Sequence, residues 1–342
     1  MSAKYEEKAA KSGEGRRRAR GKKSRRKEWG RTPDRKAQTP ERKRFGPIKG
    51  GMYTEIFLEG NGAGTIAALG ALDALISAGA VSPSPRAVCY SMGSVVAVGL
   101  ALGSSPAQIL EIIAASPLAG STNTHLVLRM MTWRGRAFTM RAIRAIVVAL
   151  GVTSKMTFRD LRAATGWDVC VLVASLSARR TYTLSDATAP TAPVLDTIIA
   201  SCAIPGMMNT GALVDGGTFG GFADATGLAP GPESLVLVTK ICRIYNPRLN
   251  PAMRLLASYR MLMYKLGSRW IDEAQRAGAT VLHVPHGCGV TATAAHIRRI
   301  FGASREWAAA VACDATPGHR EGREGREGPT APEGGTIEQI EP

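Results

Sequence analysis

The chain has 342 residues, of which 45% are hydrophobic, so it is long enough to bury one or two cores. This composition excludes a wholly disordered chain and a collagen-like repeat. The formal net charge is +17. Residues 1–49 hold 19 Lys and Arg against six acidic residues, so they carry +13 of this charge, and the other 293 residues carry only +4. A basic arm on a nearly neutral body does not by itself make the whole protein a nucleic-acid binder.

Two terminal segments are predicted to be disordered. Residues 1–48 lack an apolar period and are rich in Arg, Lys, Gly and Pro, so they cannot offset the entropy of ordering. Residues 314–342 contain a repeated Arg-Glu-Gly triplet, which predicts a solvated tail. Between them, residues 52–313 have the size of a single large α/β domain.

The body opens with a predicted strand at Tyr53–Leu58, a glycine-rich turn and a helix at 66–78. A second strand at 87–90 leads through Ser91 into a helix at 92–102. Two successive strand–turn–helix units predict a mostly parallel sheet covered by helices. Further strands are expected at 168–174, 234–240 and Thr280–Val284, and further helices at Pro106–Ala115, 138–150, 158–164, 251–277 and 292–312.

The uncharged stretch 87–110 has two interpretations. Its length permits a membrane span. However, Gly99, Gly103 and Pro106 interrupt it, which favours a buried strand–turn–helix.

The six cysteines are dispersed and show no metal-ligand spacing, which is typical of reduced cysteines packed in an intracellular protein. The charged amino-terminal region has no apolar stretch, which argues against a secretory signal peptide. We therefore expect a cytoplasmic protein or one peripheral on membranes, and the basic arm adds nuclear import as an alternative.

Three short motifs carry the candidate chemistry. Ser91 lies between a buried strand and a helix, as in a nucleophile elbow, although the pattern alone also fits a helix N-cap. The loop Gly60-Asn61-Gly62-Ala63-Gly64 precedes a helix, so its N–H groups can bind a phosphate or a developing oxyanion. A dinucleotide site is disfavoured because the GxGxxG spacing fails at Thr65. The third motif is Asp215 followed by two glycines, which taken by itself is typical of an ordinary turn.

In this order, the glycine loop, the serine elbow and the Asp-Gly-Gly motif resemble the patatin-like phospholipase family. Residues 200–206 resemble its Ala-Ser-x-Ala-Ile-Pro-Gly segment, and residues 157–161 resemble its middle region. The resemblance covers about residues 52–312. It implies a three-layer α/β/α sandwich with a mostly parallel central sheet, and a Ser–Asp dyad without the histidine of a triad.

By this resemblance, Ser91 is the expected nucleophile and Asp215 the group that accepts its proton. Gly60, Asn61, Gly62 and Ala63 are expected to supply oxyanion-hole amides. The implied activity is that of a phospholipase A-type lipid acyl hydrolase, which cleaves fatty acyl esters through an acyl-enzyme and needs no metal or organic cofactor.

The chain departs from the family pattern near these residues. The family loop usually reads Gly-Gly-Gly-x-Arg/Lys-Gly, whereas here Asn61, Gly64 and Thr65 replace the second glycine, the basic residue and the last glycine. In the elbow, Cys89 stands where glycine is usual. These departures leave open a catalytically impaired member that binds anionic membranes or nucleic acid through its basic arm.

The order Ser91, Asp215, His283 also imitates an α/β-hydrolase triad. His283 lies inside an apolar strand, where a packed or hydrogen-bonded histidine is the simpler interpretation. The dyad is therefore favoured over the triad.

Basic segments suggest further partners besides a phospholipid substrate. The stretches 126–150 and 253–270 mix cations with large apolar residues, as do helices in a lipid interface and helices packed on a sheet. The first is the better candidate lid.

The cluster at 16–27 fits a nuclear-import signal, an anionic-membrane tether, a nucleic-acid contact or a solubilising tail. Because it lacks interleaved aromatics, any nucleic-acid binding should be salt-sensitive and independent of sequence.

Overall fold

The computed structural model describes residues 52–119, 133–205, 208, 211–225, 227–239, 267–285 and 293–314. By its internal contacts the chain divides into two units, Met1–Phe45 and Gly46–Pro342, and all described residues belong to the second. The predicted arm at 1–48, with its basic cluster, lies outside the described residues, as does the predicted tail apart from Asp314. Most of the stretch 253–270 and the first part of the candidate lid also lie outside them.

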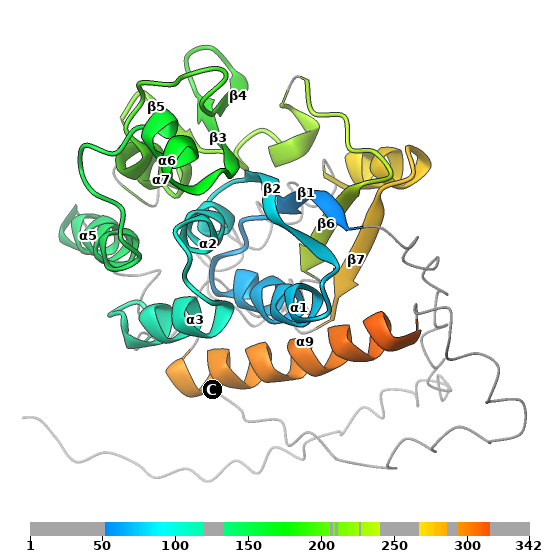
Figure 1. The fold of residues 1–342 in the computed structure, drawn as a ribbon. Helices are drawn as coiled ribbons and strands as arrows, with labels where there is room; N and C mark the ends of the chain where they lie inside the picture. The colour runs from blue at the N-terminus through cyan, green and yellow to red at the C-terminus, as the bar shows by residue number, and fades with distance from the viewer. Residues whose placement is uncertain are drawn as a thin grey trace, which may run out of the picture. The chain divides into compact units, whose positions relative to one another are not determined.

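A mostly parallel sheet of seven strands forms the centre of the second unit (Figure 1). The strand order is β4-β3-β2-β1-β6-β7, and β5 pairs with β3. The parallel strands are β1 (Tyr53–Leu58), β2 (Val81–Cys89), β3 (Asp168–Ser175), β6 (Ser234–Thr239) and β7 (Thr280–Val284), whereas β4 (Arg180–Leu184) and β5 (Leu213–Asp215) run antiparallel to β3.

Helical segments cover both faces of the sheet, because neighbouring side chains of each strand point to opposite faces. In β1, Ile56 and Leu58 belong to one hydrophobic core and Phe57 to another. The second core is completed by Phe222 and by Trp270, which lies in a helical stretch at 267–276. The first core is covered by α1 (Thr65–Ser77), α2 (Met92–Ala101), α3 (Pro106–Ala115), α5 (Trp133–Ala149), α6 (Phe158–Thr165), α7 (Val194–Ser201) and α9 (Ala294–Asp314).

This arrangement is the predicted three-layer α/β/α sandwich. Short 3-10 turns, η1 (Gly62–Gly64) and η2 (Gly221–Ala223), follow β1 and β5. The stretch 87–110 forms the end of β2, all of α2 and the start of α3, and every helix in the described ranges is too short or too polar to span a bilayer.

Strand β2 corrects the prediction, because it begins at Val81 rather than at residue 87. Pro83 and Pro85 lack the N–H that a strand donates, which weakens the strand pattern before residue 87. The register between β1 and β2 is irregular at this point, since Tyr53 pairs with Val81 but Glu55 pairs with Arg86. The two prolines therefore lie in a bulge-like irregularity.

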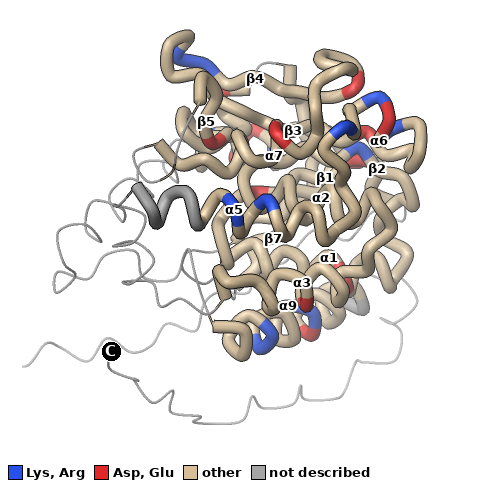
Figure 2. The backbone as a smooth tube through the Cα atoms, turned by 90° about the vertical axis from the view of Figure 1, so that its left-hand side faces the viewer, with Lys and Arg blue, Asp and Glu red and all other residues tan. Residues whose placement is uncertain are grey.

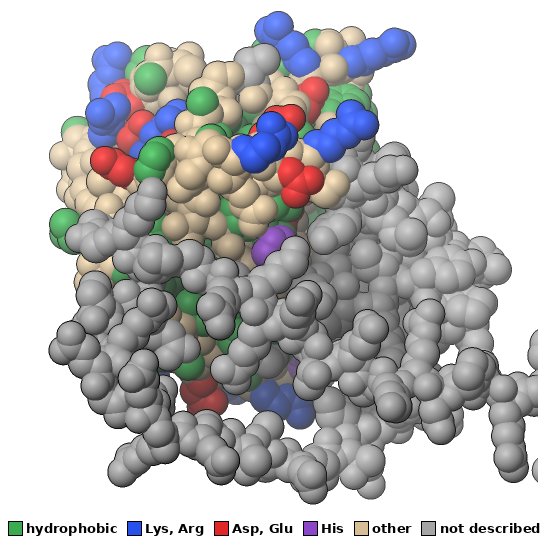
Figure 3. Space-filling model, turned by 90° about the vertical axis from the view of Figure 1, so that its right-hand side faces the viewer, with side chains coloured by type: hydrophobic (Ala, Val, Ile, Leu, Met, Phe, Trp, Pro, Cys, Tyr) green, Lys and Arg blue, Asp and Glu red, His purple; other side chains and the backbone are tan. Residues whose placement is uncertain are grey.

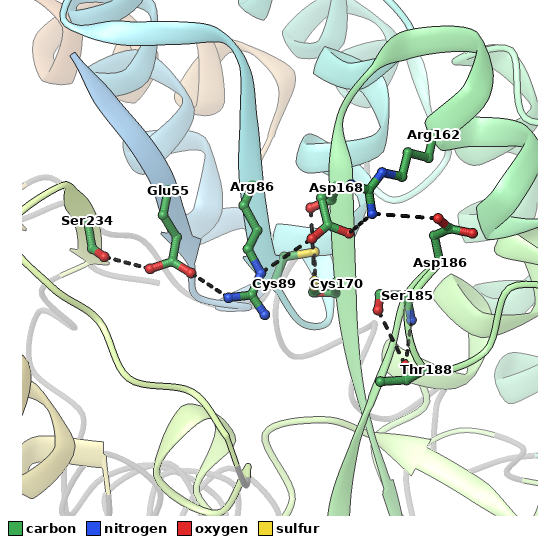
Figure 4. Close-up of polar contacts among 10 residues, drawn as sticks. All are labelled: Glu55, Arg86, Cys89, Arg162, Asp168, Cys170, Ser185, Asp186, Thr188 and Ser234. Atoms are coloured by element: carbon green, nitrogen blue, oxygen red, sulfur yellow. Dashed lines mark hydrogen bonds and ion pairs between the residues drawn. The ribbon is translucent and has the colours of Figure 1, made fainter.

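A row of polar side chains crosses the sheet at the level of the first residues of β3 and β6 (Figure 4). Ser234, Glu55, Arg86 and Asp168 are register partners on β6, β1, β2 and β3. Ser234 Oγ donates to Glu55 Oε2 at 2.6 Å, Arg86 Nη1 donates to Glu55 Oε1 at 2.9 Å, and Arg86 Nε lies 3.5 Å from Asp168 Oδ2. Arg162 extends this ion row from Asp168 towards Asp186.

Helix α9 is tied to its neighbours by charge as well as by packing. Arg298 donates to both carboxylate oxygens of Glu111 on α3, and Arg305 donates to Asp73 on α1. Charged positions of α9 and α3 lie close together in Figure 2. On the face shown in Figure 3, the described cations and carboxylates are interspersed rather than gathered by sign.

Candidate active site

Ser91 lies in a tight turn between β2 and α2. Its backbone has φ 51° and ψ −134°, a conformation that residues other than glycine rarely adopt. The turn is closed by two backbone hydrogen bonds of 2.9 Å, from Gly93 N to Tyr90 O and from Ser94 N to Ser91 O. The strained backbone carries Ser91 out of the strand direction, as a nucleophile elbow requires.

Two glycines allow the segments around Ser91 to approach one another. A Cβ at Gly93 would overlap the carbonyl oxygen of Leu58, at the end of β1. A Cβ at Gly60 would overlap Ser91 Cβ and the carbonyl oxygen of Tyr90. The glycine loop that follows β1 therefore lies directly against Ser91.

Cys89, which stands where the family usually has glycine, fits the end of β2. Its side chain is fully buried, and its Sγ donates to the carbonyl oxygen of Cys170 at 3.4 Å. Burial raises the pKa of the Cys89 thiol well above its ordinary value, and the same direction holds for Cys170 and Cys202. These three cysteines are free, as the sequence predicted, and neutral packing residues.

Ser201 supports the elbow from α7, although no role was predicted for it beyond its place in the 200–206 motif. It is fully buried, and its Oγ accepts a hydrogen bond from Ser91 N at 2.9 Å and donates one to Leu172 O at 2.7 Å. This hydroxyl therefore links the backbone of the elbow to strand β3. The motif was the signal that could have identified it.

Asp215 ends β5, and its backbone is held on both sides. Its N–H donates to Ala203 O at 3.0 Å, and its carbonyl oxygen accepts from Thr218 Oγ1 at 2.6 Å. Its Oδ1 accepts from Gly217 N at 2.8 Å. Because β5 pairs with β3, which also pairs with β2, the sheet brings Asp215 to the elbow although 124 positions separate it from Ser91.

The side chains of Ser91 and Asp215 meet in a buried environment. The Ser91 hydroxyl lies in hydrogen-bond reach of the Asp215 carboxylate and of the Cys202 sulfur. Of these two groups the carboxylate is the stronger acceptor for the single hydroxyl proton, because an ionised oxygen accepts more strongly than a thiol sulfur. Burial raises the pKa of Asp215 to about 6, while the hydrogen bonds from Ser91 and Gly217 oppose that rise.

The four predicted oxyanion-hole residues differ in what their backbones offer. Gly60 is the residue packed on Ser91. Asn61 N already donates to Thr65 Oγ1 at 3.0 Å. Gly62 and Ala63 open the 3-10 turn η1, so their amides have no carbonyl partner within that turn. These last two amides are the better candidates for binding an anion beside Ser91.

His283 lies on β7, away from the pair. Strands β1 and β6 separate β7 from β2, which leads into Ser91, so about 14 Å of sheet lies between them. This position disfavours the triad. Within the described ranges, no group of three or more His, Cys, Asp and Glu side chains could hold a metal ion.

Comparisons with known proteins give a family match and distant structural likenesses. The family described as "Patatin-like phospholipase" matches residues 56–226, which is half of the chain. No curated protein matches this chain. VipD from Legionella pneumophila shares 13% identity at a TM-score of 0.47, covering 77% of this chain and 67% of VipD.

A second likeness is to the heterodimeric ExoU–SpcU complex of the type III secretion system of Pseudomonas aeruginosa. It has 17% identity and a TM-score of 0.40, and covers 78% of this chain and 52% of that one. This chain thus spans about two thirds of VipD and about half of the chain matched in the complex.

Proposed function

Because the chain is a member of the patatin-like phospholipase family, we propose that it cleaves fatty acyl esters of glycerophospholipids as a phospholipase A-type enzyme. Family membership supports lipid hydrolysis in general, without specifying the ester that is cleaved. The observation that carries the finer proposal is the buried contact between the Ser91 hydroxyl and the Asp215 carboxylate, beside the glycine loop.

In the proposed reaction, Ser91 Oγ attacks the carbonyl carbon of the ester while Asp215 accepts the hydroxyl proton. The amides of Gly62 and Ala63 donate to the oxyanion of the tetrahedral intermediate. Its collapse breaks the ester C–O bond, and the departing alcohol takes the proton from Asp215. Water then attacks the acyl-enzyme with Asp215 again as the base, which releases the fatty acid and restores Ser91.

The raised pKa of Asp215 supports this role. A carboxylate with a pKa of about 6 is ionised at neutral pH, yet it binds a proton more readily than an exposed aspartate does. The 3-10 turn after β1 adds preorganised donors on the same side of the sheet.

The test is covalent labelling by a fluorophosphonate together with fatty acid release from phosphatidylcholine vesicles and turnover of a soluble fluorogenic acyl ester. Ser91→Ala should abolish labelling and lower turnover at least about a thousandfold. The matched control is Ser304→Ala, because Ser304 is a buried serine of α9 whose hydroxyl has no hydrogen-bond partner in the described part of the chain. A wild type that neither labels nor turns over substrate would favour the impaired alternative.

A second pair of variants separates the dyad from the triad. Asp215→Asn should abolish turnover, because an amide cannot accept the proton, whereas His283→Ala on β7 should retain it. Loss of turnover in both variants, with the fold intact, would argue for a triad.

A further inference from the structure

The positions at which the glycine loop departs from the family pattern carry side chains that hydrogen-bond to one another and to the sheet. Asn61 and Thr65 stand where that pattern has glycines, so each adds atoms that a glycine loop lacks. Both are buried, with 9% and 1% of their surface exposed. A buried polar side chain is costly unless it is paired, so their partners indicate what they do.

Asn61 reaches away from Ser91 to the neighbouring strand. Its Nδ2 donates to Thr239 Oγ1 at 2.8 Å, and Thr239 is the buried last residue of β6. Strand β6 pairs with β1 on the side opposite β2. This hydrogen bond therefore fixes the loop after β1 to a rigid element that does not contain the elbow.

Thr65 holds the loop from the first residue of α1. Its Oγ1 accepts from Asn61 N at 3.0 Å and donates to Glu59 O at 3.4 Å. One hydroxyl thus joins two backbone groups on either side of Gly60, the residue packed against Ser91. The amides of Gly62 and Ala63 are left at the opening of the turn.

We propose that Asn61, Thr65 and Thr239 form a loop clamp, which holds the amides of Gly62 and Ala63 in the geometry that binds the oxyanion. The inference rests on the proposed function of Ser91. The three residues are positioning residues, since they act on the reaction through the loop backbone. In this chain they are a matched set, because Asn61 needs the Thr239 hydroxyl for its side chain and the Thr65 hydroxyl for its N–H.

The physical reason for such a clamp is the flexibility of the loop. Gly60, Gly62 and Gly64 each have more backbone freedom than other residues, and that freedom opposes a fixed array of donors. Oxyanion donors act through preorganisation, and a shift of about 1 Å in such a group can cost about 100-fold in rate. Fixing the residue between two glycines restricts the loop without adding a Cβ at Gly60.

The first experiment replaces Thr239 in the full chain and measures soluble-ester turnover, fluorophosphonate labelling rate and melting temperature. Thr239→Val keeps the shape and removes the acceptor, and it should lower kcat and the labelling rate about 10- to 100-fold with KM within about threefold. Thr239→Ser keeps the hydroxyl and should restore most of the rate. Thr181→Val is the matched control, because Thr181 is a buried strand threonine whose Oγ1 has no described partner, and its kcat should not change.

The second experiment is a double-mutant cycle with Asn61→Gly, which restores the family residue and removes the same hydrogen bond from its other end. The double variant Asn61→Gly/Thr239→Val should be no slower than Asn61→Gly alone, because the bond can be lost only once. Multiplied losses, or single variants within threefold of the wild-type kcat, would overturn the clamp. Equal losses in Thr239→Val and Thr239→Ser would do so too.

Failure of the clamp and failure of the proposed function give different results. Turnover that survives Ser91→Ala would overturn the proposed function and, with it, any role of the clamp in that reaction. Turnover that is lost in Ser91→Ala but unchanged in the Asn61 and Thr239 variants would overturn the clamp alone. A variant that loses melting temperature but keeps kcat would also overturn it, because the hydrogen bond would then serve stability only.

Discussion

Asp215 is a buried carboxyl whose surroundings act on its pKa in opposite directions. Removal from water favours the neutral form, and the hydrogen bonds from Ser91 and Gly217 favour the charged form. Burial prevails, so the pKa lies near 6 instead of its ordinary 3.8. The unfolded chain holds this proton less tightly than the folded protein does, and the ionised side chain is therefore a cost to stability above pH 6.

Asp215→Asn should stabilise the protein at pH 8, by an amount on the order of 2–3 kcal/mol if the whole pKa difference is realised. The wild-type contribution is lost as the pH rises from about 4 through about 6, because the raised folded-state pKa favours the protonated form. The advantage of the variant should therefore be largest above pH 6 and vanish below pH 4. Melting temperatures of the two proteins across this range measure it.

The same group should set the acidic limb of the activity profile. Wild-type kcat/KM for a soluble ester should rise with pH through about 6, since the base must be ionised to accept the Ser91 proton. For the stability comparison, a difference in stability between the wild type and Asp215→Asn that stays constant from pH 4 to pH 8 would contradict the assignment of this pKa to Asp215.

At the residue scale, local motifs predicted where Ser91, Asp215 and Gly60 meet, because a strand-to-helix turn and close glycine packing leave short sequence patterns. Their catalytic roles stay predictions. Thr239 was not predicted, because its hydrogen bond joins residues 178 positions apart, which no local pattern records. Ser201, whose hydrogen bond spans 110 positions, stands in the 200–206 motif but was assigned no role. The altered loop suggested impairment, yet Asn61 and Thr65 take part in specific hydrogen bonds.

At the scale of elements, the ion row joins four neighbouring strands. Its members face one another in register, and each parallel strand reaches its neighbour only through a long crossover, so local sequence does not set the pairing. Arg86 is central, because it contacts Glu55 on one side and Asp168 on the other. A displaced strand would separate these charges.

Arg86→Met should destabilise the fold by about 1 kcal/mol, because it keeps the side-chain length but leaves Glu55 and Asp168 without their shared cation. The effect is kept modest by solvent screening, since 40% of the Arg86 side chain is exposed. Urea unfolding measures it. Arg86→Lys should recover part of the loss, and kcat should not change. An unchanged urea midpoint would show that the ion row contributes nothing to stability.

The sequence predicted most of the described elements, and those that it missed lack a clear local signal. Strands β1, β3, β6 and β7 and helices α1, α2, α3 and α6 agree with the predicted ranges to within a residue or so. Strand β4 was missed because it is a short edge strand with a polar pattern. Helix α7 was missed because, unlike the equally short α6, it begins without a side-chain cap. Helix α5 begins at Trp133, five residues before its predicted start.

At the scale of the whole molecule, charge and proposed chemistry occupy different parts of the chain. Residues 1–49 carry most of the net charge, whereas Ser91, Asp215 and the loop clamp belong to the sheet of the second unit. On the face in Figure 3, the described cations are mixed with carboxylates. We therefore propose that attraction to an anionic surface depends on the arm.

Deletion of residues 1–48 should leave kcat for a soluble ester unchanged, because the residues of the proposed site belong to the described part of the second unit. Binding to vesicles that contain phosphatidylserine should fall, and the wild-type binding should weaken as salt is added. Co-sedimentation at two salt concentrations measures this, with neutral vesicles as the control. Equal binding by the full and shortened chains would place the attraction in the body. A salt-sensitive shift of DNA by the full chain alone would support the nucleic-acid alternative.

The ion row lies within the strands, whereas the candidate active site follows their carboxyl ends. Glu55, Arg86 and Asp168 lie at least three residues before the last residue of their strands, while the loop after β1 and the elbow after β2 follow the carboxyl ends. We therefore expect mutations that alter recognition of the proposed substrate to fall on the connections that follow the strands, away from the ion row. The connections after the strands can therefore change in sequence during evolution, and with them the preferred substrate, while the residues that pair the strands stay the same.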